Sequence, residues 1–285
     1  MGGRLRRPQN AWIVSLHGLP PLSGYAAPSA PPGRPLGFGD VQIEPATNQW
    51  GQPLGWVVEG WEPRPEPVAI TMPGRHCRLE PFDVARHAND LYTAYSADDG
   101  RMWTYLPYGP FESADQYRDR MGRFASDASM AVFAIVDAAS ERAGGVAAYQ
   151  RAAPEYGSVE VGHIALSPRL QRTVAATEAM ALMMGYVFNV LGYRRYEWKC
   201  DALNLPSRRA AERLGFAYEG TFRRAVVVKG RNRDTAWFSV TDGDWQRLEP
   251  AFAAWLAPAN FDALGRQRQA LSDLTAEALT RTPSR

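Results

Sequence analysis

From residue 76 onward, apolar positions recur alternately with the spacing of strands and of helices. Short alternating runs predict strands, and longer runs with a period near 3.6 predict helices. In order, we predict strand 76–81, helices 82–95 and 114–125, strands 131–136, 145–150 and 158–166, helix 174–189, strand 195–200, helix 204–215, strands 221–228 and 235–240, and helices 242–255 and 262–279. This order predicts an α/β fold, a mixed sheet with helices on both faces.

Several of these helices carry boundary signals. Ser113 and Asn204 are good N-cap residues, and Gly215 can adopt the left-handed conformation that ends a helix. We predict that helix 174–189 is amphipathic, with one apolar stripe. The stripe consists of Ala176, Met180, Met183, Met184 and Val187.

The chain divides into four stretches by composition. Residues 1–38 are rich in Pro, Gly, Ser and Arg, which predicts a disordered leader because little apolar surface can be buried. In residues 39–75 prolines interrupt the apolar residues, which predicts an extended strap lying on a folded body. These apolar residues are Trp50, Trp56, Val57, Val58 and Trp61. Residues 76–257 form the predicted domain, and 258–285 a helical tail.

The composition argues against several classes of protein. No apolar run is long enough for a membrane span, and the run 12–16 is too short for a signal peptide. Cys77 and Cys200 are far apart in sequence, so we expect a reducing cytoplasm and no disulfide framework. No Cys/His cluster has the spacing of metal ligands, so no metal is expected.

Positive charge is concentrated in one part of the chain. Residues 169–233 hold 13 Lys or Arg and 5 Asp or Glu, a net +8, so the rest of the +2 chain carries −6. A basic segment suits a polyanionic ligand, although a solvated helix face and a charged hairpin edge explain it as well. Nucleic-acid binding is not favoured, because no groove-reading motif accompanies the charge.

Two motifs lie in the run 166–216. The first, 171–179, is a turn of small and polar residues that opens a helix after a strand, and its unpaired N–H groups form a seat for a phosphate. The second, 204–207, caps the helix that closes at 214–216. Together they resemble the acyl-CoA site of the GNAT superfamily of N-acetyltransferases, most closely its RimJ/RimL-like branch. The resemblance covers about 76–256 and implies the GNAT acyl-CoA N-acyltransferase fold.

The resemblance implies acetyl-CoA as cosubstrate, with its pyrophosphate on the amides of the first motif. Gln171 and Ala176 match the family pattern, whereas Val174 replaces its middle glycine, so the valine side chain must point away from the seat. An ordinary strand-to-helix turn is the alternative. The implied coenzyme contacts are Leu166, Gln171, Arg172, Thr173, Val174, Ala175, Ala176, Thr177 and Asn204.

A carboxylate interrupts the apolar strand 158–166. Strand alternation assigns one face to Glu160, Gly162 and Ile164, and the other to Val161, His163 and Ala165. A buried Glu160 is costly unless it is paired or functional. The resemblance implies that it accepts the amine proton, directly or through water, with a pKa raised by burial. A salt-bridged structural Glu160 is the alternative, and His163 ranks second as a base.

A serine follows the capping asparagine of the second motif by three residues. The resemblance to the RimL-like branch implies that Ser207 protonates the departing thiolate, and Ala211 stands where many members carry a tyrosine acid. Closing the helix cap begun by Asn204 is the alternative role for Ser207.

The loop 103–111 is crowded with aromatic residues. Core packing accounts for two of them, and four in one loop predict a wall for the acceptor substrate. They are Trp103, Tyr105, Tyr108 and Phe111. The Arg-rich stretches 208–209 and 229–233 suit the adenosine 3′-phosphate or an acidic acceptor.

These features predict an acetyl-CoA-dependent N-acetyltransferase that transfers the acetyl group directly to a primary amine in a ternary complex. Neither cysteine lies in a motif for a covalent intermediate. The acceptor is a protein N-terminal α-amine or a small-molecule amine, and the sequence does not choose between them. The prediction includes no membrane partner and is compatible with a homodimer. The alternative is a non-catalytic acyl-CoA-binding or regulatory module of the same fold.

Overall fold

The computed structural model describes residues 46–280, and the predicted leader 1–38 lies outside them. The strands are β1 (Ala46–Thr47), β2 (Pro53–Leu54), β3 (Met72–Pro73), β4 (Cys77–Pro81), β5 (Ala131–Asp137), β6 (Arg142–Ala153), β7 (Ser158–Leu166), β8 (Arg195–Asp201), β9 (Ala217–Val228) and β10 (Arg231–Thr241). The helices are α1 (Val84–Tyr95), η2 (Arg101–Trp103), α2 (Ala114–Ala125), α3 (Val174–Gly185), η3 (Tyr186–Val190), α4 (Leu205–Arg213), α5 (Asp242–Leu256), η4 (Pro258–Asn260) and α6 (Leu271–Thr280). The α/β class and the order predicted from residue 76 to 256 are confirmed.

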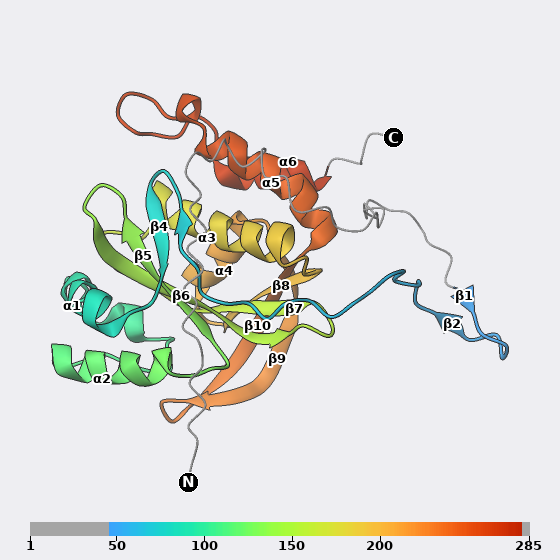
Figure 1. Ribbon diagram of the computed structural model, residues 1–285, viewed down its shortest axis with the longest axis horizontal. Helices are drawn as coiled ribbons and strands as arrows, with labels where there is room; N and C mark the ends of the chain where they lie inside the picture. The colour runs from blue at the N-terminus through green and yellow to red at the C-terminus, as the bar shows by residue number, and fades with distance from the viewer. Residues whose placement is uncertain (1–45, 281–285) are drawn as a thin grey trace, which may run out of the picture.

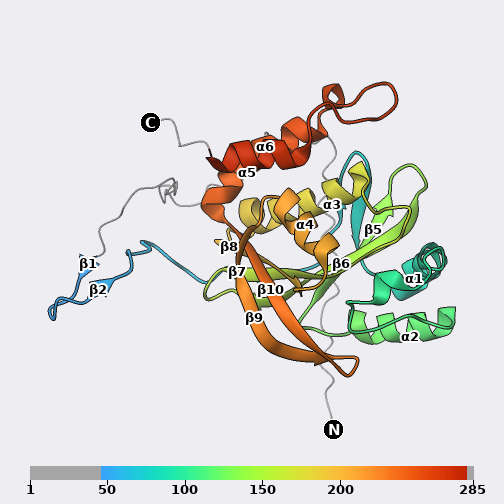
Figure 2. The same cartoon turned by 180° about the vertical axis from the view of Figure 1, so that it is seen from behind.

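Eight strands form one mixed sheet in the order β3-β4-β5-β6-β7-β8-β10-β9. The neighbours are antiparallel except β7 and β8, which run parallel. Parallel neighbours need a crossover connection, and α3 supplies it. Figures 1 and 2 show α1 and α2 on one face of the sheet and α3 to α6 on the other. The predicted layers are therefore present.

Two separate hydrophobic cores hold these layers together. One fills the space between the sheet and α3, α4 and α5, and the other lies between the sheet and α1 and α2. Alternate residues of β5 belong to different cores: Phe133 and Ile135 to the first, Ala134 and Val136 to the second. The sheet therefore separates two cores that have no buried side chain in common.

The predicted amphipathic character of helix 174–189 is wrong. In α3 every residue is buried except Val174 and Leu182, which are half-buried, and the π-helical η3 continues it. The sheet and α5 enclose the helix, and a helix that is apolar all round is a buried one. The start of α3 is therefore fixed within the core of the domain.

The predicted helix 262–279 is only partly correct, since α6 begins at Leu271. Before it, the Asp262 carboxylate accepts the N–H groups of Leu264 and Arg266, both at 2.9 Å, and Gly265 has a φ of 72°. An aspartate side chain that bonds the nearby backbone in this way competes with helix formation. The stretch 262–270 is a loop for that reason.

The segment before β3 contacts the body at Trp61 and Arg64. The Trp61 indole donates to the Glu155 carbonyl at 2.9 Å, and the Arg64 guanidinium lies 4.5 Å from the centre of the Trp61 ring. Before this point Trp50 and Val57 are 74% and 75% exposed. Figures 1 and 2 show β1 and β2 standing away from the sheet. Trp61 and Arg64 thus attach this part of the segment to the loop between β6 and β7.

A buried carboxylate on α3 fastens the turn that leads into β4. Glu178 Oε1 accepts the N–H of Arg75 at 2.9 Å, and Oε2 accepts those of His76 at 2.6 Å and Cys77 at 2.9 Å. A Cβ on Gly74 would come within 2.5 Å of Oε2, so the turn requires glycine there. One side chain thus satisfies three backbone donors that would otherwise be unpaired in the interior.

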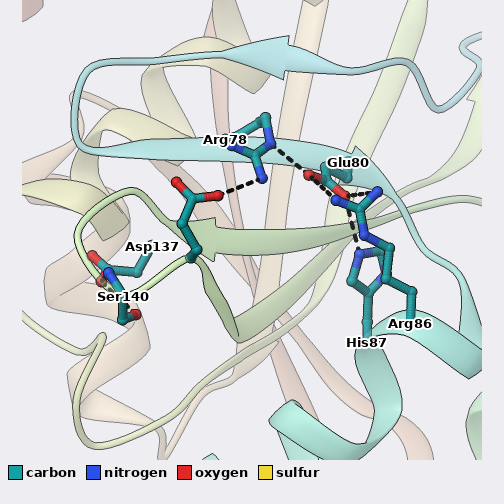
Figure 3. A network of polar contacts seen from close by, with 7 residues as sticks. Arg78, Glu80, Arg86, His87, Asp137 and Ser140 are labelled. Carbon is teal, nitrogen blue, oxygen red and sulfur yellow. Dashed lines mark hydrogen bonds and ion pairs between the residues drawn. The ribbon is translucent and has the colours of Figure 1, made fainter.

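A second buried carboxylate joins β4 to α1 (Figure 3). Glu80 contacts Arg78 Nε at 2.5 Å, Arg86 Nη1 at 2.7 Å and His87 Nε2 at 3.1 Å. Because His87 Nδ1 accepts the Asp83 N–H at 3.0 Å, its Nε2 carries the proton and donates to Glu80. Burial alone would raise the pKa of Glu80, but the hydrogen bonds from Arg78 and His87 outweigh it and lower that pKa.

Residues 46–280 contain no helix long and apolar enough to cross a membrane. In the same residues no group of three or more His, Cys, Asp or Glu is arranged to hold a metal ion. Cys77 and Cys200 are buried and unbonded to each other, and burial raises the pKa of both thiols. Neither sulfur is thereby suited to act as a thiolate nucleophile.

Candidate functional site

The parallel strands β7 and β8 separate halfway along their length. Their ladder runs from Ser158 opposite Arg195 to Val161 opposite Trp198 and then ends. Both strands continue, β7 to Leu166 and β8 to Asp201. The result is a wedge in the middle of the sheet, with backbone groups on β7 that β8 does not pair.

A β-bulge explains the separation. His163 has a φ of 52°, and the register between β6 and β7 shifts between Val146 and Ala148. One extra residue on one strand bends and twists it away from its neighbour. The bulge also ends the predicted alternation. His163 contacts the rings of the α2 core, on the Glu160 face, while Ile164 packs against the opposite core. Ala165 also lies in the α2 core, whereas Val161 lies in the opposite one. The predicted faces of His163, Ile164 and Ala165 are therefore wrong.

The first turn of α3 offers free N–H groups. Thr173 is extended, with φ −95° and ψ 166°, and its hydroxyl oxygen accepts the Ala176 N–H at 3.1 Å. The N–H groups of Val174 and Ala175 come before any residue that an α-helix can pair. Together with the helix dipole they can bind an anion such as a phosphate. Arg172, in the left-handed conformation with φ 61°, turns the chain into this position.

The other predicted coenzyme contacts have distinct places. The half-buried Val174 side chain packs against the α3 core, so it does point away from the exposed amides. Gln171 Nε2 donates to the Leu166 carbonyl at 2.8 Å and closes the loop between β7 and α3. Thr177 lies one turn further along, buried, where its hydroxyl accepts a hydrogen bond from Arg213 at 3.1 Å. The Thr177 side chain therefore lies apart from the free N–H groups of Val174 and Ala175.

Glu160 is buried on the α2 face, with a hydrogen bond to one carboxylate oxygen and ion pairs to the other. Its Oε1 accepts a hydrogen bond from Gln150 at 2.7 Å. Its Oε2 lies 3.1 Å from Lys199 Nζ and 3.5 Å from Arg151 Nε, without hydrogen-bond alignment. Lys199 also pairs with Glu197 at 2.7 Å. The carboxylate thus belongs to an ionic network on the sheet face, beside the point where β7 and β8 part.

Ser207 lies against the same point from the α4 side. Its Oγ accepts the Trp198 indole N–H at 3.0 Å, and Trp198 is the last residue of β8 that pairs with β7. The Ser207 backbone N–H donates to Asn204 Oδ1 at 3.2 Å, which makes Asn204 the N-cap. Because the indole donates to Oγ, the hydroxyl proton is available to another acceptor. The cap is formed by Asn204, so the Ser207 hydroxyl is not needed for it.

His163 is a half-buried, neutral side chain at the bulge. Its ring stacks on Tyr108 at 5.7 Å and meets the Phe124 ring edge-on at 4.4 Å. Burial, reinforced by the charges of Arg120 and Arg151, lowers its pKa to about 4. A histidine of such low basicity is poorly matched to removing a proton near pH 7, which makes it a weaker candidate base than Glu160.

The low pKa of His163 predicts a pH dependence of stability. Between pH 6.5 and about 4 the unfolded chain binds a proton that the folded protein excludes, so the free energy of unfolding falls as the pH decreases. We expect wild type to lose about 1 kcal/mol per pH unit more than His163→Gln in this window, measured by urea unfolding. Parallel stability curves for the two proteins would contradict this assignment.

The four aromatic residues of the loop 103–111 do not form one wall. Trp103 and Tyr108 are buried in the α1/α2 core, and the Trp103 and Phe111 rings meet edge-on at 5.3 Å. Trp103 and Phe111 also line a cavity of 260 Å3 between α1 and α2. Of the four, the half-buried Tyr105 side chain lies outside the α1/α2 core, and its hydroxyl donates to the Leu203 carbonyl at 3.2 Å. Core packing therefore accounts for three of the four.

The same loop meets the tip of the β9–β10 hairpin. Lys229 Nζ donates to the Trp103 carbonyl at 2.8 Å, and partial burial lowers the pKa of this amine. Together with the bond from Tyr105 to the β8–α4 loop, this contact brings three segments distant in sequence around the open end of the wedge. Figure 1 shows the hairpin extending from the sheet toward the α2 side.

Sequence reasoning missed three residues that contact Glu160: Gln150, Arg151 and Lys199. Lys199 was detectable, because alternation in strand 195–200 places it on the same face as Glu197. Gln150 and Arg151 come from β6, and nothing local to the sequence indicates their pairing with β7. Their position depends on the register of the sheet.

The comparisons with known proteins agree with this geometry. A family model described as an acetyltransferase (GNAT) domain matches residues 76–217. A GCN5-related N-acetyltransferase from Brucella melitensis is 44% identical, with a TM-score of 0.75 over 77% of this chain and 100% of that one. A probable acetyltransferase (GNAT family) from Chromobacterium violaceum is 38% identical, with a TM-score of 0.64 over 68% and 98%.

A curated relative points the same way. It is named uncharacterized N-acetyltransferase p20, from Bacillus licheniformis, and is 28% identical over 146 residues, which are 50% of this chain and 81% of the relative. The relatives are named as acetyltransferases, which supports acyl transfer as the activity. The chain therefore belongs to the GNAT superfamily of N-acetyltransferases.

Proposed function

We propose that the protein transfers the acetyl group of acetyl-CoA directly to a primary amine within a ternary complex. The observation that carries this proposal is the wedge between β7 and β8, with free amides of α3 on one side and a buried carboxylate on the other. The two substrates would approach from opposite faces of the sheet and meet in the wedge. Holding both in one geometry removes much of the entropic barrier to their reaction.

In this mechanism the amine nitrogen attacks the thioester carbonyl, a C–N bond forms and the C–S bond breaks. Glu160 takes the amine proton, directly or through water, while Lys199 and Gln150 hold the carboxylate in place. Ser207 gives its hydroxyl proton to the departing thiolate, and the Trp198 indole keeps Oγ oriented for that step. Glu160 then releases its proton to solvent and Ser207 takes one up, which restores both groups. Unpaired backbone N–H groups along the wedge would stabilise the oxyanion.

The experiment that tests this function measures release of CoA thiol from acetyl-CoA over a panel of amines, amino acids and peptides. Turnover with any amine supports an acetyltransferase. A protein that is stabilised by acetyl-CoA, by about 2.7 kcal/mol at a hundred times Kd, yet releases no thiol would be the non-catalytic acyl-CoA-binding module.

Val174→Pro tests whether one backbone N–H group at the start of α3 binds the pyrophosphate of acetyl-CoA. Proline suits the first position of a helix and removes only the N–H group there, and the extended Thr173 before it tolerates proline. Loss of one charge-assisted hydrogen bond should raise the Kd of acetyl-CoA about 10-fold or more, measured by calorimetry. Val174→Ala keeps the N–H and is the matched control. Equal affinities for the two variants would place the pyrophosphate elsewhere.

We also propose membership of the RimJ/RimL-like branch, because Ser207 follows Asn204 by three residues and Ala211 occupies the position of the more common tyrosine acid. Ala211 is completely buried, so this position has no access to a leaving group. The two free, buried cysteines support the cytoplasm as the location.

A further inference from the structure

A cavity of 390 Å3 lies on the α2 face next to the candidate base. Its walls come from the end of α2, the following residues 127–130, and Gln150, Arg151 and His163 of the sheet. This volume is within the range of pockets that hold small molecules or one group of a larger ligand. The aromatic cluster, in contrast, lies behind it in the α1/α2 core.

The cavity is directly continuous with the catalytic network. Gln150 and Arg151 line the cavity, and the same two side chains contact Glu160 at 2.7 and 3.5 Å. His163, at the bulge where β7 leaves β8, forms another part of the wall. A molecule in this cavity is thus one side chain away from the group that we propose as the base.

The charge of the lining is strongly positive. Three guanidinium groups, those of Arg120, Arg123 and Arg151, face one carboxylate, that of Asp127. The Asp127 carboxylate already accepts two hydrogen bonds from Ser129, from its N–H at 2.9 Å and its hydroxyl at 2.6 Å. His163 is neutral near pH 7 and adds no charge.

Two of these arginines have no acidic partner of their own. Among the described residues 46–280, Arg120 and Arg123 form no ion pair, whereas Arg118 on the same helix pairs with Asp115 at 2.6 Å. Arg120 is held in position, since its guanidinium lies 5.0 Å from the centre of the Tyr108 ring. A fixed, unpaired guanidinium beside a reaction site is suited to bind a carboxylate or phosphate through two hydrogen bonds.

We propose that this cavity binds an anionic group of the acceptor, so that the preferred acceptors are amines that also carry a carboxylate or phosphate. The inference rests on the proposed function and specifies its substrate class. The anionic group can belong to a small amino acid or to an acidic residue close to the N-terminus of a peptide. Both present the same chemistry to Arg120 and Arg123, while the amine reaches the wedge beside Glu160.

The test compares matched acceptors by thiol release at low salt. One series consists of ω-amino acids with one to four carbons between amine and carboxylate, each paired with its uncharged amide. The other consists of short peptides with acidic or neutral second and third residues. We expect at least one acid to exceed its neutral counterpart about 10-fold or more in kcat/KM. Whichever series shows the preference identifies the source of the anion.

Reversing the charge of one arginine in the cavity lining tests whether that arginine binds the anionic group. Arg123 is exposed, so Arg123→Glu should fold normally, raise KM for the acidic acceptor about 10-fold or more and leave the Kd of acetyl-CoA unchanged. Arg268→Glu is the matched control and should change KM little, because Arg268 is likewise exposed, forms no ion pair within residues 46–280 and lies outside the cavity lining. Turnover with equal kcat/KM for acids and neutral analogues, or equal effects of the two substitutions, would overturn this inference alone. No turnover with any amine would overturn the proposed function as well.

Discussion

Glu160→Gln is expected to lower kcat by about 10²- to 10⁴-fold, the usual contribution of a general base. Glutamine keeps the size of the side chain and can still bond Gln150, but it cannot accept the amine proton. Affinity for acetyl-CoA should be unchanged, because the free amides of α3 lie on the other side of the sheet. Raising the pH should recover part of the rate by increasing the neutral fraction of the amine in solution. Steady-state kinetics from pH 6 to 9 measure each effect.

Glu197→Gln is the control that distinguishes a catalytic role of Glu160 from a role in the ionic network. Glu197 pairs with the same Lys199, at 2.7 Å. Both substitutions remove one carboxylate from the Lys199 ammonium, whereas only Glu160 contacts Gln150 and Arg151 of the cavity lining. We expect Glu197→Gln to keep most of its activity. Comparable losses of kcat in the two variants would show that Glu160 acts only as part of the ionic network.

Glu178→Gln is expected to lower the free energy of unfolding by about 2–4 kcal/mol. The carboxylate accepts three backbone N–H groups of residues 75–77, and an amide in its place turns an NH2 group toward at least one of these donors. Buried donors that lose a charged acceptor cost about 1–3 kcal/mol each. Urea unfolding should show a lower midpoint with an unchanged slope.

The control for this change in charge is Glu212→Gln on α4, where the side chain is exposed. An exposed substitution of this kind is expected to stay within about 0.5 kcal/mol of wild type. If Glu178→Gln were equally mild, the turn before β4 would have to be held by other contacts. Activity of the folded variant at low temperature should remain, because Glu178 lies away from the wedge.

The local parts of the fold and site were predictable from the sequence. Ser113 and Asn204 cap their helices as expected, since capping depends on residues within one turn. The boundaries of β7 and the start of α3 at Val174 were also predicted, because an alternating strand followed by a small polar turn is a short-range signal. These elements contain the proposed phosphate site, whose position therefore depends on short-range signals alone.

The parts that depend on tertiary contacts were not predictable. The bulge at His163 reverses the expected face of that residue. Gly162, directly before it, was the one local sign, since an isolated glycine in a strand often marks a bulge. The burial of α3 on all sides, in contrast, was readable in the sequence, because apolar residues occupy nearly every position of the helix and do not form one stripe. The cavity beside Glu160 combines α2 with β6 and β7, segments brought together only by the sheet register.

The division of the interior into two cores has a consequence for how this protein can change. Substitutions among the α1/α2 side chains and substitutions around α3 share no packed neighbours, so their free-energy effects should add. Acceptor preference could then drift by mutation on one face of the sheet while coenzyme binding stays constant on the other. A combinatorial library restricted to α2 and the residues that follow it would therefore explore new acceptors without the epistasis that a shared core imposes.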